Sequence, residues 1–535
     1  MSTKKNTVTK NIKTKKYWKG IKRYSDVLFW SIKITEIALK SKNFNKARDQ
    51  VFSKWQIKPE VKREVTALTY TLSKKLGLTK LLIEASQREK FEESSSLLRA
   101  TLLVTGTEIL TNAVNVNTIL EKLIKVYPRL KVHAGFSKRL EWVLKKLRST
   151  QAKILKNKIT SLWKIVKYFS TPALAASEED FKLLLNYSFP AWFFKKLKKQ
   201  YGRNTALKIV DFFNNKGISP VRINAISLAL ESNTAILSNF KEEKSYEISK
   251  SQAFKKGLIT VQSKMALSIA AKSAELIIEL LNQKDKVVVF DACSAPGKKL
   301  GAIIEYLVGQ ALLNNKKESA NNIFNTSSTT KEVIVISNDI QFPRIKQTIE
   351  EIKRILQPLN PKHTSLVQIE AGFIKIEISN ILKLKIAFLC SDALKLPIKP
   401  TNLSITIPFD ISILDVPCTG SGTVQKHPER RWFINPQDPI EFSYKQVEFI
   451  KKFVKLTTSY IIYATCSIFK EENQMVIKTI LKSHTLQTSP KTKSQPEIFQ
   501  AGIPLIQLKF EKVFLPHIEN STGGYCTVLS VNHAN

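Results

Sequence analysis

The feature that most constrains the fold is a series of short apolar runs in the second half of the chain. Five such runs follow Lys286, and helical stretches separate them, at 287–290, 333–336, 386–389, 411–414 and 460–463. Apolar runs of this length are typical of strands buried on both faces, and strands that alternate with helices form parallel sheets. The sequence therefore predicts an α/β, doubly wound and mostly parallel sheet within residues 271–535.

The first half of the chain carries helical periodicity instead. One predicted helix face is marked by apolar residues at three- and four-residue spacing, namely Val116, Ile119, Leu120, Leu123 and Ile124. Strand signals are weak in this part of the chain. We therefore predict an all-helical bundle at residues 24–150.

Between these two regions, residues 151–270 are predicted to hold a linker helix at 159–169 and a small mixed module with a short strand at 221–224. Two later segments have the character of insertions. Residues 314–330 are rich in Asn, Ser, Thr and Lys, which favours a loop. Residues 357–384 are longer than a helix-to-strand connection requires.

The charge balance favours a polyanionic partner. Lys and Arg number 85 against 44 acids, a net charge of +41, although a lysine-rich soluble surface is the alternative. Residues 1–23 form a basic tail, which either touches RNA nonspecifically or is only solvated. The tail lacks an apolar signal core, so we expect a cytoplasmic protein. The five cysteines include no CxxC pair, so free thiols are expected and a metal site is not.

Polar residues follow three of the predicted strands, where ligands bind in such sheets. The first strand runs into an Asp-Ala-Cys-Ser-Ala-Pro-Gly segment at 291–297, and its Pro-Gly turn lets backbone N–H groups approach a ligand. Asp339 after the second strand suits the ribose hydroxyls of a nucleoside, with Arg344 nearby, or caps a helix. Asp392 after the third strand suits an adenine amino group, or caps a turn.

Two cysteines follow the fourth and fifth predicted strands. Cys418 stands in Asp-Val-Pro-Cys-Thr-Gly-Ser-Gly-Thr, and Cys466 stands in Ala-Thr-Cys-Ser. A buried inert thiol is the usual reading of a single cysteine. It fits poorly here, because both cysteines lie among loop residues rather than in the apolar runs.

These segments resemble, in order and spacing, the Sun family of RNA cytosine-5 methyltransferases. Its markers read here as Asp-Ala-Cys-Ser-Ala-Pro-Gly-Lys-Lys, Asn-Asp, Ser-Asp-Ala, the Pro-Cys segment through His-Pro-Glu-Arg-Arg-Trp, and Thr-Cys-Ser with Glu-Glu-Asn behind it. The 98–101, 116–124 and 134–144 segments look like the helical domain of the antitermination factor NusB. Bacterial ribosomal RNA methyltransferases of the RsmB (Fmu) type join such a domain to a Sun-type half.

The resemblance implies an S-adenosylmethionine-dependent enzyme that acts on RNA, with ribosomal RNA of the small subunit (16S) as the first substrate and transfer RNA as the alternative. It implies Cys466 as the nucleophile, Cys418 as the thiol that assists product release, and Asp415 as the group that holds the cytosine edge. The cofactor-binding residues that it implies are Cys293, Ser294, Ala295, Pro296, Gly297, Lys298, Lys299, Asp339, Arg344, Asp392 and Asp415. The second glycine and the threonine of the family's Gly-Gly-Lys-Thr are missing from this chain.

The chemistry explains why cytosine requires these residue types. C5 is a poor nucleophile, and a thiolate added to C6 turns the ring into an enamine that can attack a methyl group. Nothing in this chemistry distinguishes the two cysteines, so exchanged roles stay open, as does a role for Lys299 in lowering a thiol pKa or holding a phosphate. A monomer is expected. A non-catalytic RNA-binding or ribosome-assembly protein is the other class of function, and it would have lost Cys466 or Asp415.

Overall fold

The structure is a computed structural model. It describes residues 21–87, 89–112, 114–132, 134–156, 159–215, 220–230, 248, 250–315, 329–359, 366–370, 372–396, 408–488 and 504–533. Most of the basic tail and most of the 314–330 segment lie outside these residues. The described chain divides into two compact units, one of residues 1–195 with 427–433, the other of residues 196–426 with 434–535. The four-part division predicted from the sequence stays a prediction.

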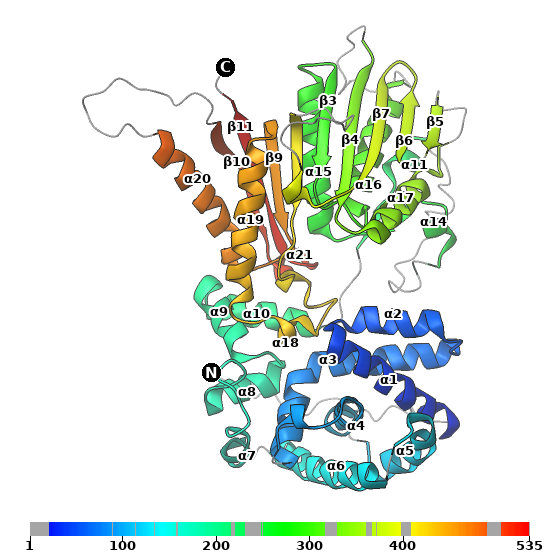
Figure 1. Cartoon of the computed structure of the whole chain (residues 1–535), viewed down its shortest axis with the longest axis vertical. Helices are drawn as coiled ribbons and strands as arrows, with labels where there is room; N and C mark the ends of the chain where they lie inside the picture. Colours follow the sequence, from blue (N-terminus) through cyan, green and yellow to red (C-terminus); the bar gives the residue numbers. More distant parts are fainter. Residues whose placement is uncertain are drawn as a thin grey trace, which may run out of the picture. The chain divides into compact units, whose positions relative to one another are not determined.

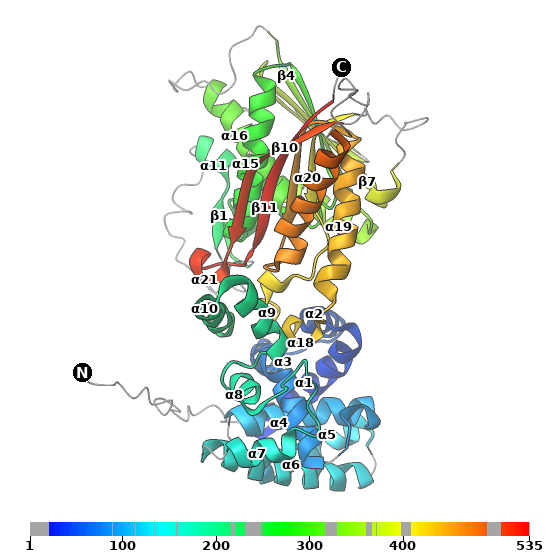
Figure 2. The same ribbon diagram turned by 90° about the vertical axis from the view of Figure 1, so that its left-hand side faces the viewer.

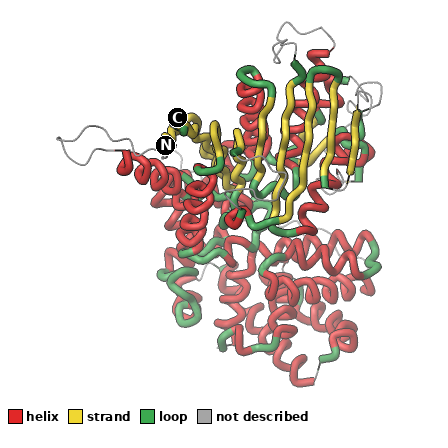
Figure 3. The backbone as a smooth tube through the Cα atoms, turned by 45° about the horizontal axis from the view of Figure 1, so that its top comes forward, coloured by secondary structure: helices red, strands yellow, loops and turns green. Residues whose placement is uncertain are grey.

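The first unit is helical throughout its described residues (Figures 1 and 3). Its helices are α1 (Ile21–Ser41), α2 (Phe44–Lys54), α3 (Pro59–Gln87), η1 (Phe91–Glu93), α4 (Ser96–Asn112), α5 (Val116–Leu130), α6 (Ala134–Leu155), α7 (Ile159–Val166) and α8 (Glu178–Tyr187). The first of them begins at Ile21, inside the predicted tail. The predicted face of α5 is only partly buried, because Ile124 is 64% exposed.

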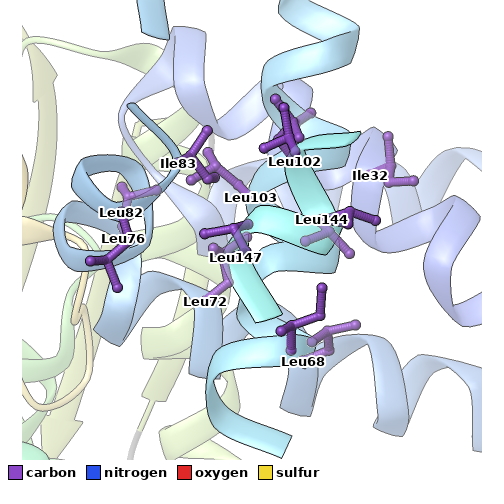
Figure 4. Packing of buried hydrophobic residues seen from close by; sticks show 14 of the residues in the cluster. Ile32, Leu68, Leu72, Leu76, Leu82, Ile83, Leu102, Leu103, Leu144 and Leu147 are labelled. Atoms are coloured by element: carbon purple, nitrogen blue, oxygen red, sulfur yellow. The ribbon is translucent and has the colours of Figure 1, made fainter. Parts of the chain in front are cut away.

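Helix α4 lies at the centre of this unit. Its residues 100–109 are all buried, as expected of a helix surrounded by other helices. It packs against α1, α3 and α6, and Figure 4 shows Leu102 and Leu103 of α4 among Leu72 of α3 and Leu144 and Leu147 of α6. These leucines are almost completely buried, so the unit has a core of its own.

A segment from far along the chain belongs to this helical unit. Residues 427–433, which end in α18 (Arg430–Phe433), pack within it. The indole Nε1 of Trp432 donates to the backbone oxygen of Ser73 at 2.9 Å, and its ring occupies the space beside Gly77. The guanidinium of Arg431 is fully buried, lies 3.9 Å from the ring centre of Phe189 and donates to Ser188 O at 3.1 Å. The His-Pro-Glu-Arg-Arg-Trp marker is therefore an anchor in the helical unit.

The second unit is built around a nine-stranded sheet in the order β10-β11-β9-β8-β3-β4-β7-β6-β5 (Figure 1). The strands are β3 (Lys286–Asp291), β4 (Lys331–Asp339), β5 (Leu366–Glu370), β6 (Phe373–Ile378), β7 (Leu382–Cys390), β8 (Phe409–Asp415), β9 (Thr457–Thr465), β10 (Leu505–Phe514) and β11 (Gly524–Asn532). The five central strands run parallel, and both edges are antiparallel. This confirms the predicted doubly wound, mostly parallel sheet.

Helices cover both faces of the sheet, as the apolar strands require. Val287 and Val289 of β3 pack toward α15 (Lys264–Leu281), α16 (Lys298–Asn315) and α17 (Phe342–Leu356). Val288 and Phe290 point to the other face, toward α19 (Asp438–Val454) and α20 (Gln474–Thr488). The last two helices lie side by side in Figure 2 and contact each other.

A two-stranded ribbon, β1 (Val221–Ile223) paired with β2 (Ile259–Val261), joins this unit and confirms the short strand predicted at 221–224. The Asn224 side chain donates to the backbone oxygen of Ile355 on α17 at 2.7 Å, and Arg222 pairs with the buried Glu305 of α16. The ribbon is thus fastened to the helices behind the sheet. The remaining elements are α9 (Ala191–Tyr201), α10 (Arg203–Asn214), α11 (Ala225–Ala229), α14 (Gln252–Lys255), η2 (Ala393–Lys395), η3 (Ser421–Thr423), η4 (Lys470–Glu472) and α21 (Pro516–Glu519).

The segment interpreted as an insertion at 357–384 adds strands β5 and β6 to the sheet edge. The connection is long because the chain turns back twice before it enters β7. Of the helices that the structure describes, none is long and apolar enough to cross a bilayer.

Candidate active site

The candidate site lies at the carboxyl ends of the parallel strands, where the chain reverses its direction of winding. From β3 the chain continues to β4 on one side, whereas β8 lies on the other side of β3. Such a switch point opens a crevice between the loops that follow the two strands. Asp291 ends β3 and Asp415 ends β8, so the two carboxylates flank this point.

The loop after β3 is fixed against the end of β4. The Ser294 N–H donates to the backbone oxygen of Asn338 at 2.9 Å, and the hydroxyls of Ser294 and Ser337 lie 2.8 Å apart. Gly297 adopts a φ of +85°, and an added Cβ would lie 2.8 Å from Thr348. A glycine is needed here for its backbone angle and for its closeness to α17. The loop then enters α16 and directs the N-terminus of that helix toward the crevice.

Asn338 is the first residue of the Asn-Asp marker, and no role was predicted for it from the sequence. Its side-chain nitrogen donates to Ala292 O at 3.0 Å and to Ser391 O at 3.1 Å, and its oxygen accepts from the Ser391 N–H. One amide thus ties together the loops that follow β3, β4 and β7. In the sequence, this role was indicated only by the position of the Asn-Asp pair at the end of β4.

The predicted nucleoside-binding acids are close to this loop and already have protein partners. Asp339 is buried, pairs with Arg344 at 3.1 Å and accepts the Gln341 N–H at 3.0 Å, and Arg344 also donates to Ala295 O at 2.7 Å. Asp392 caps η2 by accepting the Leu394 N–H at 3.0 Å. Each carboxylate keeps further lone pairs, so capping does not prevent a second bond to a ligand.

The two predicted catalytic cysteines come together. Cys418 follows β8 and Cys466 follows β9, and their Sγ atoms lie 3.1 Å apart. Both side chains are partly exposed to solvent. The Gly422 N–H donates to Cys466 O at 2.9 Å and joins the two loops. Two thiols at this distance share their protons as one unit rather than titrating independently.

A charged cluster lies beside the thiols. The Lys299 ammonium forms an ion pair with Asp415. Burial opposes the charge on Lys299, but Asp415, Asp291 and Cys466 raise its pKa overall. Burial raises the pKa of Asp291 to about 7, and Lys299 lowers it while Asp415 raises it. The cation therefore carries a strongly held proton next to Cys466.

The two sulfurs experience different electrostatic surroundings. The hydrogen bond with Cys466 raises the pKa of Cys418, and burial and the charges of Glu472 and Asp415 add to this effect. Lys299, in contrast, is attracted to a thiolate at Cys466. Burial raises the pKa of Cys293 in the β3 loop, where Asp415 and Asp291 also disfavour a thiolate. Cys293 therefore has the character of a neutral lining residue.

Two lysines of the basic helix α9 already have protein partners. Lys195 pairs with Asp180 at 2.7 Å, and Lys196 pairs with Glu471 at 2.8 Å. Ion pairing of this kind reduces the charge that each lysine offers to a phosphate. These two lysines are accordingly weaker candidates for RNA contacts than unpaired lysines would be.

A model of the protein family described as 16S rRNA methyltransferase RsmB/F matches residues 329–530. The ribosomal RNA small subunit methyltransferase B of Yersinia enterocolitica is 23% identical over 416 residues, which cover 75% of this chain and 78% of that protein. The probable ribosomal RNA small subunit methyltransferase B of Coxiella burnetii is 22% identical over 362 residues, covering 65% of this chain and 69% of that protein. The solved structure of PH0851 covers 94% of this chain and 98% of its own, with a TM-score of 0.62 and 20% identity, and so shares the fold.

Proposed function

Because residues 329–530 belong to the RsmB/F family of S-adenosylmethionine-dependent RNA methyltransferases, we propose that this protein methylates C5 of a cytosine in small-subunit (16S) ribosomal RNA. The observation that carries the proposal is the pair of thiols, Cys418 and Cys466, at 3.1 Å beside the Lys299–Asp415 ion pair. Methylation of an oxygen or nitrogen atom needs no covalent nucleophile. Attack at C6 to activate C5 does need one.

The residues around the crevice fit S-adenosylmethionine. The β3 loop that holds Gly297 follows the carboxyl end of β3, where ligands bind in this fold, and Asp339 supplies a buried carboxylate at the end of the next strand, where ribose hydroxyls bind. Asp392 is available for the adenine end. When bound, the cofactor supplies an electrophilic methyl group on a sulfonium. Lys298 and Leu300 replace the glycine and threonine of the family pattern, and Lys298 Nζ instead donates to Val261 O at 3.0 Å.

Residues of the chain itself have separate roles in the reaction of the cytosine. Cys466, stabilised as a thiolate by the Lys299 ammonium, adds to C6 of the base. Asp415 holds the N3 and amino edge, and Lys299 keeps its carboxylate oriented. Cys418 keeps its proton during the attack. After methyl transfer, water takes the C5 proton, the C5=C6 double bond re-forms as the Cys466–C6 bond breaks, and Cys418 donates a hydrogen bond to the departing Cys466 thiolate. The base must be unpaired or flipped out of a helix to reach these groups.

The substrate is proposed from the relatives, whose names specify small-subunit ribosomal RNA. The net charge of +41 suits any large RNA, so transfer RNA is the second candidate. Action in the cytoplasm as a monomer remains a prediction. The intact thiol pair argues against a non-catalytic assembly protein.

The proposal is tested with the purified chain, methyl-labelled cofactor and each RNA class separately. Nucleoside analysis of the digested RNA should show 5-methylcytidine in small-subunit ribosomal RNA and none in transfer RNA. Label in transfer RNA alone would show that transfer RNA, the second candidate, is the substrate. Label in another nucleoside would refute the cytosine chemistry. Bisulfite sequencing of cellular RNA with and without the gene would then locate the position.

A further inference from the structure

One buried carboxylate lies behind both thiols. Glu472 in η4 is fully buried, and its Oε2 accepts from the Thr419 hydroxyl at 2.6 Å and from the Ser467 hydroxyl. Its Oε1 accepts the backbone N–H of Thr419 at 2.8 Å. Thr419 directly follows Cys418, and Ser467 directly follows Cys466. A single side chain therefore holds the residue after each cysteine.

A second buried side chain supports the same loop from α19. Gln446 donates to Pro417 O at 3.1 Å and to Glu472 Oε1 at 3.4 Å. The residues before and after Cys418 are thus tied to the same pair of side chains. On the other loop, the Ser467 hydroxyl also lies 2.9 Å from that of Ser421. The separation of the two sulfurs is consequently set by a hydrogen-bonded network whose central member is Glu472.

The network also determines the charge at its centre. Burial raises the pKa of Glu472 overall, although Ser467, Thr419 and Gln446 donate hydrogen bonds that act in the opposite direction. A carboxylate that accepts four donors is suited to the ionised form. Two of the Glu472 bonds go to Thr419, directly after Cys418, and one goes to Ser467, directly after Cys466, so the carboxylate is held mainly by the Cys418 loop. Its charge disfavours a thiolate at Cys418, and the Lys299 cation favours one at Cys466. The other titratable groups around the thiols include Asp415, paired with Lys299, and Asp291, which interacts with both. They also include Tyr463, whose hydroxyl donates to the Glu472 backbone oxygen at 2.6 Å.

We propose that Glu472 is a positioning residue that fixes the two thiol loops and makes the thiols unequal, so that Cys466 ionises while Cys418 keeps its proton. The assignment of nucleophile and release thiol rests on the proposed function. The inequality itself rests on the hydrogen bonds of Glu472 and on the opposite charges of Glu472 and Lys299. Glu472 acts through Thr419 and Ser467 and through its charge.

The test measures the two thiols directly, without RNA or cofactor. The purified chain is treated with iodoacetamide between pH 6 and 9.5, and initial alkylation rates of the two cysteine peptides are followed by mass spectrometry. Alkylation requires the thiolate, so the rate ratio reports which sulfur ionises. In the wild type, Cys466 should react faster. Glu472→Gln keeps the size of the side chain but removes its charge, and should raise the Cys418 to Cys466 ratio roughly three- to tenfold.

The matched control is the same substitution one residue earlier. Glu471 bonds to Lys196 and Gln200 at 2.8 and 2.7 Å and not to either thiol loop, so Glu471→Gln should leave the ratio unchanged. If Glu472→Gln does not melt cooperatively, Thr419→Val removes one hydroxyl donor from Oε2 and should shift the ratio in the same direction by less. A wild-type ratio in a folded Glu472→Gln chain, or an equal shift in Glu471→Gln, overturns the inference.

A kinetic measurement gives a second readout. With an RNA that the enzyme methylates, Glu472→Gln should lower kcat by about tenfold or more and change the KM for RNA by less than about twofold, because the residue acts on the reacting groups and not on RNA binding. A shift in the alkylation ratio without any methyl transfer by the wild type would support the inference and remove the proposed function. Methyl transfer by the wild type, with an unchanged alkylation ratio in Glu472→Gln, would support the proposed function and overturn the inference.

Discussion

The Sγ atom of Cys418 lies 3.1 Å from that of Cys466, although the two residues are 48 positions apart in the chain. Parallel pairing of β8 with β9 brings their carboxyl ends together, and the loops after both strands turn toward each other. The Glu472 carboxylate disfavours a thiolate at Cys418, and the Lys299 cation favours one at Cys466. Identical side chains thereby acquire different chemistry from their surroundings.

Replacement of the proposed nucleophile should abolish catalysis. Cys466→Ala leaves no thiolate at C6, so methyl transfer should fall by at least about a thousandfold. The residue is only partly buried, so the melting temperature should change little. The measurement is label transfer to purified RNA together with a thermal melt. Turnover within tenfold of wild type would show that Cys466 is not the nucleophile.

Asp339 is expected to bind the cofactor. Asp339→Ala should weaken binding of S-adenosylhomocysteine by roughly 10- to 100-fold, the usual cost of losing hydrogen bonds to a charged group. The Arg344 contact to Ala295 O should preserve the loop. Calorimetric titration measures the affinity. Unchanged affinity, in a chain that still melts like the wild type, would mean that Asp339 serves only Arg344 and the start of α17.

Asp291 should make stability depend on pH. Its pKa is raised to about 7 in the folded chain from 3.8, mainly by burial, so the folded state retains a proton that the unfolded state has lost. The free energy of unfolding therefore decreases as the pH rises from about 4 to about 7 and is then constant. Asp291→Asn removes this contribution, so the melting temperature of the variant relative to wild type should be higher at pH 8 than at pH 5. An equal difference at both pH values would contradict the assignment.

Gly77 and Trp432 should be energetically coupled. Alanine normally stabilises a helix interior by about 0.5–1 kcal/mol over glycine, but a Cβ at Gly77 would overlap the Trp432 ring. Gly77→Ala should therefore destabilise the wild-type chain and stabilise the Trp432→Ala variant. Urea unfolding of the four chains of the cycle measures this reversal of sign. Gly135→Ala, where a Cβ meets nothing within 4 Å, is the control and should give the same change in both backgrounds.

The apolar runs predicted the five parallel strands because such strands are buried on both faces and carry a continuous signal. The resemblance to the Sun family is likewise confirmed for the catalytic half. Strand β10 was missed because it lies at the sheet edge, where most of its residues are exposed and no continuous apolar run marks it. Strand β6 did carry a signal: its residues alternate between buried isoleucines and more exposed positions, as expected of an antiparallel strand.

The reactive residues of the site could be predicted from the sequence, whereas the buried side chains that position them could not. Cys418 and Cys466 stand in loops whose residue types mark them, whereas Glu472 was visible only as one of two adjacent acids. The sequence does not show which of Glu471 and Glu472 faces inward, because that depends on the short η4 turn. Arg431 is a similar case. A charged arginine side chain is normally expected to be exposed, but that of Arg431 is buried, with backbone oxygens and an aromatic ring as partners.

The most direct test of the account is a gel measurement on Cys418→Ala. If Cys466 attacks and Cys418 assists release, this variant should bond to RNA, transfer the methyl group and stall. A slowly migrating protein–RNA adduct should then accumulate on a denaturing gel in the presence of S-adenosylmethionine, and peptide mass spectrometry should locate the RNA on Cys466. Cys466→Ala should give no adduct. An adduct with Cys466→Ala and none with Cys418→Ala would contradict the assignment of the two thiols, and no adduct with either would contradict covalent catalysis itself.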